Sequence, residues 1–314
     1  MGNVTADSNL AIQTLGITRK FGASTVVDRV DLNIRKGEIF SLLGPNGAGK
    51  TTMIRMLSCL LSPTSGTASI MGMDIMKEPQ SVKQVINVSP QETAIAGHLN
   101  IMENMMLIGG CYGLSRSENR SRAEELIRLA GFQDRMKDQV RKLSGGMQRR
   151  LSIAMALISD PQVLFLDEPT LGLDPQSRRE LWKQIENLKG KKTILLTTHY
   201  LEEADALSDR IAIIKNGKLI AEGTSGELKR SLHGLQTMTI RSAQVTQSCI
   251  EGLRSKYQEV NLIEGGLEIK SPSIVFDETV DYIRLKGTKI DWLTMNEVSL
   301  DDVFLTLTEE EVKK

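Results

Sequence analysis

The stretch SLLGPNGAGKTT, residues 41–52, joins a short apolar run to a glycine-rich segment that ends in a lysine and two hydroxyl residues. Residues 39–43 are mostly apolar and flanked by turn residues, which is typical of a buried parallel strand. The next residues have the pattern G-x-x-x-x-G-K-T, in which glycines let several backbone N–H groups point at one anion. The expected contacts to that anion are Gly44, Pro45, Asn46, Gly47, Ala48, Gly49, Lys50, Thr51 and Thr52.

The residues after this loop add charge and a metal ligand to the site. A helix is predicted over residues 51–61, and its N-terminal dipole favours a negative group at the loop. Lys50 is expected to reach the β- and γ-phosphates, and the hydroxyl of Thr51 is expected to hold Mg²⁺. The sequence therefore predicts a site for a nucleoside triphosphate with Mg²⁺.

A second segment, VLFLDEPT at residues 163–170, places two carboxylates after four consecutive apolar residues. Such a run predicts a strand buried on both faces, and open α/β sheets bind ligands at the carboxyl ends of their strands. Because successive strand residues point in opposite directions, Asp167 is expected to face the metal and Glu168 an attacking water. Pro169 lacks an N–H group and should end the strand pairing.

A third segment, LSGGMQRRLSIAMAL at residues 143–157, predicts another helix whose N-terminus suits an anion. Ser144 is a good N-cap residue, and Gly145 and Gly146 allow a ligand to approach the backbone. Apolar residues at positions 147, 151, 154 and 158 predict one core-facing side of this helix. Arg149 and Arg150 are expected to lie on its solvated side.

Composition limits the classes of function. Among the 314 residues, 39 basic residues balance 39 acidic ones, so binding to nucleic acid through overall charge is not expected. The hydrophobic content of 40% is typical of a globular protein with a sizeable core. No run of residues is long and apolar enough to span a bilayer, so a membrane role is expected to require a partner.

These segments together resemble the ATP-binding subunits of ABC transporters. GPNGAGKTT is similar to the Walker A loop, LSGGM to the ABC signature, and VLFLDEP to the Walker B strand. The remaining matches are Phe21 for the adenine-stacking aromatic residue, Gln91 for the Q-loop, Asp174 in LGLD for the D-loop, and His199 for the switch histidine. Their order and spacing fit over about residues 10–230, as a cassette with a helical lobe at about 92–160.

The resemblance implies a mechanism and partners. Two ATP-binding subunits, identical or paralogous, would pack head to tail, so that each ATP lies between one Walker A loop and Ser144, Gly145 and Gly146 of the other chain. Glu168 would orient or deprotonate the water, and His199 would hold the γ-phosphate. Gln91 would touch Mg²⁺ and sense a membrane subunit. The chain would therefore act at the cytoplasmic face of the membrane as a peripheral protein.

The fold class implied is α/β: a P-loop core with an antiparallel β subdomain and a helical subdomain, followed by a small α+β appendix over residues 231–314. Residues 1–9 are expected to be a flexible N-terminus. In the appendix, alternating patterns predict strands near residues 235–242, 266–271 and 289–297, with helices over 273–287 and from 299 onward. The segment SLDDVFLTLT at residues 299–308 resembles the tail of daunorubicin-resistance ATPases, which serve ABC-2 membrane subunits.

Two other functions remain open from the sequence. One is an importer ATPase with a regulatory C-terminal domain, since only the tail and the LGLD segment favour export. The other is an ABC ATPase that acts on DNA or ribosomes without transport. The single cassette, the short gap between the phosphate loop and the signature, and the balanced charge all disfavour that reading.

Overall fold

The computed structural model describes residues 9–231, 236–242, 245–296 and 299–309. The chain divides into two compact units, residues 1–224 and residues 225–314. Helix α8 (Ser225–Ser231) therefore groups with the C-terminal residues, although the sequence pattern placed it in the cassette. Of the N-terminal segment expected to be flexible, residues 1–8 lie outside the described residues.

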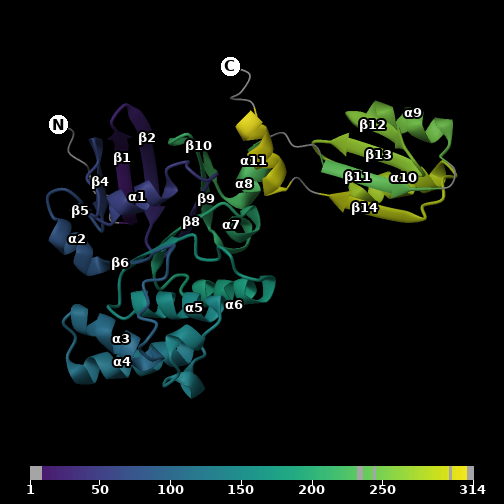
Figure 1. Ribbon diagram of the computed structural model, residues 1–314. Coiled ribbons are helices and arrows are strands. Elements are labelled where there is room, and N and C mark those ends of the chain that lie inside the picture. The colour runs from purple at the N-terminus through teal and green to yellow at the C-terminus, as the bar shows by residue number, and fades with distance from the viewer. Residues whose placement is uncertain (1–8, 232–235, 243–244, 297–298, 310–314) are drawn as a thin grey trace. The chain divides into compact units, whose positions relative to one another are not determined.

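A largely parallel sheet forms the centre of the first unit (Figure 1). Its strand order is β10-β9-β3-β8-β7-β6, and only β10 runs antiparallel to its neighbour. Every residue of β3, β7 and β8 is buried, which explains why these strands are mostly apolar without alternation. The strands are β3 (Ile39–Leu43), β6 (Ile86–Ser89), β7 (Val163–Asp167), β8 (Thr193–Thr198), β9 (Arg210–Lys215) and β10 (Lys218–Gly223).

This strand order determines where the candidate site forms. Strand β8 pairs in parallel with β3 on one side and with β7 on the other. The carboxyl ends of β3 and β7 are therefore brought to the same edge of the sheet, although Leu43 and Asp167 are 124 positions apart along the chain. Ligand sites in open parallel sheets form at this edge.

An antiparallel sheet lies beside the parallel one in the first unit, with the order β2-β1-β4-β5. Its inward residues, among them Ile12, Val30 and Ile34, belong to the same apolar cluster as Phe40 and Leu42 of β3, so the two sheets share one core. Its strands are β1 (Leu10–Phe21), β2 (Ser24–Arg35), β4 (Ser65–Ile70) and β5 (Met73–Asp74).

The helices of the first unit fall into two groups (Figure 1). Those close to the parallel sheet are α1 (Lys50–Leu57), α2 (Pro79–Val85), α6 (Pro175–Glu186) and α7 (Leu201–Leu207). The helical lobe contains α3 (Ile101–Cys111), α4 (Arg116–Leu129), α5 (Gly145–Ala156) and two 3₁₀ turns, Gln133–Arg135 and Val140–Lys142. The prediction of mostly helical structure over residues 92–160 agrees with these elements.

Local capping explains why the lobe helices begin where they do. Ser115 accepts a hydrogen bond from the Glu118 backbone N–H at 3.3 Å, as its position before α4 predicted. At α3, Asn100 and Glu103 form a reciprocal capping box with two bonds of 2.8 Å. Gly131 follows α4 with a φ of 77°, which is the left-handed conformation expected after a helix end.

The second unit contains a sheet of order β12-β13-β11-β14, antiparallel throughout, and two helices between its strands. The chain order β-α-β-β-α-β with this pairing is the ferredoxin-like arrangement, and helix α11 follows it and contacts α8. The elements are β11 (Gln236–Arg241), α9 (Gln247–Lys256), β12 (Glu259–Ile263), β13 (Gly266–Ser271), α10 (Phe276–Leu285), β14 (Trp292–Asn296) and α11 (Leu300–Glu309).

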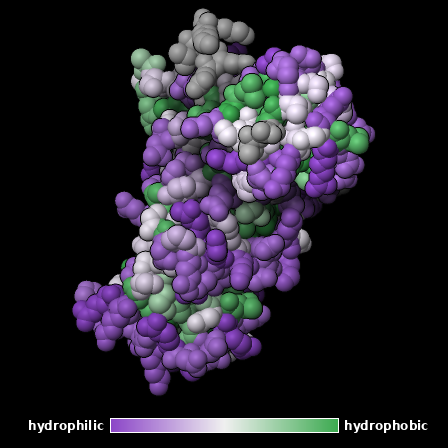
Figure 2. All heavy atoms as spheres, turned by 90° about the vertical axis from the view of Figure 1, so that its right-hand side faces the viewer, coloured by the Kyte–Doolittle hydropathy of each residue, from purple (hydrophilic) through white to green (hydrophobic). Residues whose placement is uncertain are grey.

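The α/β class with a small α+β appendix is confirmed. The predicted strands β11, β13 and β14 and the helices α10 and α11 all occur, and Ser299 accepts a hydrogen bond from the Asp302 N–H at 3.2 Å at the start of α11. The sequence pattern missed α9 and β12. Within the described residues, no helix is both long and apolar enough to cross a membrane. On the face drawn in Figure 2, hydrophilic residues predominate and hydrophobic ones form scattered groups.

Candidate active site

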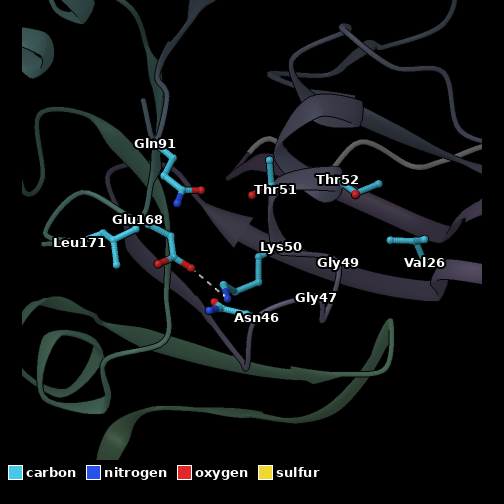
Figure 3. A pocket seen from close by; sticks show the side chains of 10 residues that line it. All are labelled: Val26, Asn46, Gly47, Gly49, Lys50, Thr51, Thr52, Gln91, Glu168 and Leu171. Atoms are coloured by element: carbon cyan, nitrogen blue, oxygen red, sulfur yellow. Dashed lines mark ion pairs between the residues drawn. The ribbon is translucent and has the colours of Figure 1, made fainter. Parts of the chain in front are cut away.

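The glycine-rich loop lies between β3 and α1 and forms one wall of a pocket of about 300 Å³ (Figure 3). Two of its glycines are required by close packing: a Cβ on Gly44 would lie 2.3 Å from the Ile214 carbonyl, and one on Gly49, where φ is 103°, would lie 2.5 Å from the Val26 carbonyl. The pocket is lined by Val26, Asn46, Gly47, Gly49, Lys50, Thr51, Thr52, Gln91, Glu168 and Leu171.

Lys50 provides the positive charge of this pocket. Its Nζ donates to the carbonyl oxygens of Gly44 at 2.8 Å and Pro45 at 3.1 Å, so the loop folds around its own lysine. The same Nζ forms an ion pair of 3.1 Å with Glu168 Oε1, drawn in Figure 3. Both side chains are almost fully buried, which strengthens the attraction relative to a pair in water.

Asp167 and Glu168 contact different groups, as their alternation along the chain predicted. Asp167 Oδ1 accepts hydrogen bonds from Thr197 Oγ1 at 2.6 Å and Thr51 Oγ1 at 3.2 Å. Glu168 lies just past the strand with a φ of 46°, and its N–H donates to the Thr197 carbonyl at 3.1 Å. This left-handed conformation is uncommon for a residue with a side chain, and it directs the Glu168 carboxylate toward Lys50.

His199 completes the group around Glu168. Its Nδ1 lies 2.6 Å from Glu168 Oε2 and forms a hydrogen bond with it. The ion pair with Lys50 is formed by the other carboxylate oxygen, Oε1. The histidine follows β8 and Glu168 follows β7, and these strands are neighbours in the sheet. Glu168 is thus held between a lysine of the phosphate loop and a histidine of the next strand.

Oxygen donors suited to Mg²⁺ converge beside the phosphate loop. The Thr51 hydroxyl and the Asp167 carboxylate are within hydrogen-bond distance, and Gln91 lines the same pocket. Mg²⁺ prefers hydroxyl, carboxylate and phosphate oxygens and usually keeps several waters, so this sparse set fits it. The described residues contain no cluster of three or more His, Cys, Asp or Glu side chains suited to a metal.

The signature residues do not line this pocket in the part of the chain that the structure describes. Ser144 and Gly145 are exposed at the start of α5, where Ser144 Oγ accepts from the Met147 N–H at 3.3 Å. Gly146 is buried, and a Cβ there would lie 2.6 Å from both Cβ and Oγ of Ser177 on α6. Asp174 caps α6 by accepting from the Ser177 N–H at 3.0 Å, and hydrogen bonds from the side chain and then the backbone of Ser177 lower the pKa of Asp174.

Phe21 also lies apart from the residues that line the pocket. Its side chain is 47% exposed, and the guanidinium of Arg19 lies 4.5 Å from the ring centroid. One face of the ring is therefore occupied by a cation–π contact. Val26, five residues further along, lines the pocket directly and was not among the predicted residues.

The expectation for Arg149 is wrong. This side chain is 4% exposed, and all its hydrogen bonds are to backbone carbonyls around the candidate site. Helix α5 lies between two apolar clusters, one with Leu151 and Ala154 in the helical lobe and one with Ile153 and Ala156 beside the parallel sheet. A helix buried on both sides has no solvated face for Arg149. Arg150 is partly buried and pairs with Glu180 at 3.3 Å.

Sequence reasoning also missed Thr197 and Glu203. Thr197 bonds both Asp167 and the Glu168 backbone, and its place in the apolar run TILLTT concealed this polar role. Glu203 on α7 is fully buried, accepts from Trp182 Nε1 at 3.2 Å, and has its pKa raised by burial. The signal available in the sequence was that Glu203 lies four residues after His199, on the first turn of a helix that faces the sheet.

A parallel sheet with a glycine-rich loop after one strand, carboxylates at the end of the strand two places along the sheet, and a buried lysine that pairs with one of them defines a P-loop nucleotide hydrolase. The profile of the ABC transporter family matches residues 27–171. The chain is 41% identical over 306 residues to the daunorubicin/doxorubicin resistance ATP-binding protein DrrA of Streptomyces peucetius, covering 95% of this chain and 92% of the relative.

Other similarities extend over the cassette or the whole chain. The linearmycin resistance ATP-binding protein LnrL of Bacillus subtilis is 36% identical, with 95% of this chain and 98% of the relative covered. A solved ATP-binding subunit of an ABC transporter is 30% identical with a TM-score of 0.63, covering 71% of this chain and 93% of that one. This chain belongs to the ABC transporter family, as an ATP-binding subunit that hydrolyses ATP and works with a membrane permease.

Proposed function

We propose that this chain powers export of a drug, antibiotic, lipid or similar compound through a separate membrane subunit of the ABC-2 type. The observation that supports export most strongly is the 41% identity to DrrA, because it covers 95% of this chain and therefore includes the C-terminal unit as well as the cassette. The linearmycin resistance protein and a Nod factor export ATP-binding protein of Rhizobium, 35% identical over 98% of this chain, are similar over the same length.

In this proposal the phosphate groups of ATP bind the loop from Gly44 to Thr52, with Lys50 at the β- and γ-phosphates. To reach them, Lys50 exchanges its ion pair with Glu168 for phosphate oxygens. Thr51, Gln91 and Asp167 hold Mg²⁺, which when bound neutralises phosphate charge. Phe21 contributes a face for the adenine ring.

Glu168 acts on the attacking water. Once Lys50 binds phosphate, Glu168 keeps its hydrogen bond to His199 and is free to accept a proton from water at Oε1. His199 fixes the direction of the carboxylate through the 2.6 Å contact and holds the γ-phosphate. In phosphoryl transfer, most of the rate gain comes from such positioning and charge stabilisation.

The second half of each site comes from another ATP-binding subunit, identical or paralogous. Ser144 and Gly145 are exposed and lie outside the pocket of their own chain, which leaves them available to the γ-phosphate held by a partner. A solved cassette that is 28% identical, with a TM-score of 0.60, is a dimer bound to ADP and phosphate. Asp174 caps α6, which packs against the signature helix α5. In this proposal Asp174 lies at the same interface. The pair works at the cytoplasmic face of the membrane.

The catalytic assignment is tested by Glu168→Gln. The amide cannot accept the water's proton, so turnover should fall about 10²–10⁴-fold while ATP binding persists. Turnover is measured as phosphate release, and binding with a fluorescent ATP analogue. Wild-type turnover in this variant would remove Glu168 from the mechanism.

Export is tested by identifying a membrane protein encoded by a neighbouring gene and combining it with this chain. The two proteins are copurified and reconstituted in lipid vesicles, and ATP-dependent accumulation of a fluorescent anthracycline inside inverted vesicles is followed. Glu168→Gln supplies the matched control without hydrolysis. Failure to copurify, or stimulation of ATPase activity only by a solute-binding protein, would contradict the exporter assignment.

A further inference from the structure

Arg149 makes its hydrogen bonds to four backbone carbonyls that belong to two different catalytic segments. Its Nη2 donates to Asp167 O at 2.7 Å and its Nε to Pro169 O at 2.8 Å. Its Nη1 donates to Gln91 O at 3.3 Å and also to Pro90 O. One side chain therefore bridges the segment that carries Glu168 and the segment that carries Gln91.

The carbonyls on the Walker B side flank the catalytic candidate directly. The Asp167 carbonyl belongs to the peptide group just before Glu168, and the Pro169 carbonyl to the peptide group one residue further on, so two bonds to one guanidinium hold the backbone before and after Glu168. Glu168 has a φ of 46°, a conformation that costs energy for a non-glycine residue and requires support from its surroundings. The guanidinium supplies part of that support.

The guanidinium is suited to this arrangement and is charged. It has five N–H donors in a fixed planar fork, which allows bonds in two directions at once. Burial lowers the pKa of Arg149 to about 10, so the group stays protonated at neutral pH. Its charge is balanced by carbonyl dipoles and by the nearby carboxylates of Asp167 and Glu203.

Arg149 also connects these segments to the signature. It lies on α5, five residues after Ser144, and the helix between them is continuous. We propose that Arg149 is a positioning residue for ATP hydrolysis, which holds Gln91 and Glu168 in one geometry and ties both to the signature helix. This inference rests on the catalytic role proposed above for Glu168.

The test separates positioning from simple stabilisation through Arg149→Lys. Lysine keeps the positive charge but has its donors on one nitrogen, so it cannot reproduce the planar fork whose three nitrogens reach the Asp167, Pro169 and Gln91 carbonyls. Helix α5 also contacts β6 through a 3.0 Å hydrogen bond between Ser152 Oγ and Ser89 Oγ. This bond remains in the variant and supports its fold. Arg149→Gln is made in parallel in case the lysine variant binds no nucleotide.

Steady-state ATP hydrolysis is measured on the full chain, and kcat is normalised to the number of sites that bind trinitrophenyl-ATP. For Arg149→Lys we expect kcat to fall about 10- to 100-fold, the scale of a misplaced catalytic group, with KM for ATP within about threefold of wild type. The matched control is Arg150→Lys on the same helix, which contacts Glu180 and the Phe132 ring and should keep wild-type kcat.

Each outcome decides between the alternatives. A normalised kcat within about twofold of wild type in the variant that binds nucleotide would show that Arg149 only stabilises the fold. An equal loss in Arg150→Lys, or a rise in KM with unchanged kcat, would also overturn the inference. If Glu168→Gln retains wild-type turnover, the catalytic role proposed for Glu168 fails and this inference fails with it. If only Arg149→Lys retains wild-type turnover, this inference fails alone.

Discussion

At the scale of single residues, the site concentrates buried charge within a short distance. Lys50 and Glu168 pair at 3.1 Å, both nearly inaccessible, and His199 contacts the same carboxylate at 2.6 Å. Buried ion pairs contribute little net stability because desolvation offsets their attraction. In the proposed mechanism the value of this ion pair is chemical, since Lys50 would exchange the Glu168 carboxylate for phosphate without leaving the pocket.

Glu203 differs from these residues because it forms no direct ion pair among the described contacts, although the charges of Arg178 and Arg149 act on it from nearby. Burial raises its pKa above the ordinary value of 4.5. For a carboxyl group with a raised folded-state pKa, the folded state binds more protons than the unfolded state once pH exceeds 4.5, so stability falls as pH rises toward the folded pKa.

Replacing Glu203 with glutamine should therefore stabilise the protein, and the gain should grow with pH. We expect a melting temperature higher than wild type by roughly a few degrees at pH 8, with the difference shrinking toward pH 5. Thermal unfolding across that pH range measures it. Glu202→Gln, at an exposed neighbouring position, is the control and should show no such trend. A gain in melting temperature that does not change with pH would mean that ionisation of Glu203 is not what lowers the stability.

At the scale of elements, the signature helix α5 and the D-loop helix α6 meet in a contact that leaves no room for a side chain. Gly146 and Ser177 form it, while a Cβ on Gly145 would find no atom within 4 Å. The two adjacent glycines therefore have different structural requirements, although the sequence pattern treats them alike.

Gly146→Ala should lower the free energy of unfolding by about 1–3 kcal/mol, because the new methyl group overlaps Ser177 Cβ and Oγ. Gly145→Ala should change it by less than about 1 kcal/mol, since alanine favours the helix and the space is open. Ser177→Gly removes both overlapping atoms and should restore most of the loss in the double variant. Urea unfolding without nucleotide measures all three, and equal effects of the two alanines would contradict the packing argument.

The same elements show what the sequence could and could not predict. The phosphate loop, the strand before Asp167 and the cap at Ser115 are local patterns, so spacing along the chain was sufficient. Arg149 was assigned wrongly because two separate cores bury opposite sides of α5, which only the tertiary arrangement determines. The Lys50–Glu168 pair depends on the order β3-β8-β7, and no spacing of residues encodes that order.

At the scale of the whole molecule, the residues that we propose to form an ATP site lie in two separate places on each chain. The phosphate pocket contains Lys50, Thr51 and Glu168, whereas Ser144 and Gly145 lie exposed at another position on the same unit. In the C-terminal unit, the ferredoxin-like arrangement was harder to predict. Helix α9 and strand β12 have weak sequence patterns, and the sheet order β12-β13-β11-β14 pairs strands that are far apart in the sequence. The separation in the cassette predicts that hydrolysis requires two chains.

Ser144→Arg tests this requirement directly. In a Glu168→Gln background, which should retain ATP, we expect the parent to form an ATP-dependent dimer and the Ser144→Arg variant to remain monomeric, because a bulky cation occupies the position that faces the partner's γ-phosphate. ATP binding to the monomer should be unchanged, since Ser144 does not line its own pocket. Ser115→Arg is a matched control: Ser115 is also an exposed N-cap residue with a 3.3 Å bond, so both variants lose about 1 kcal/mol of capping. Sedimentation velocity with and without ATP distinguishes the monomer from the dimer. A dimer that persists in Ser144→Arg but not in Ser115→Arg would place the interface on α4 instead of the signature.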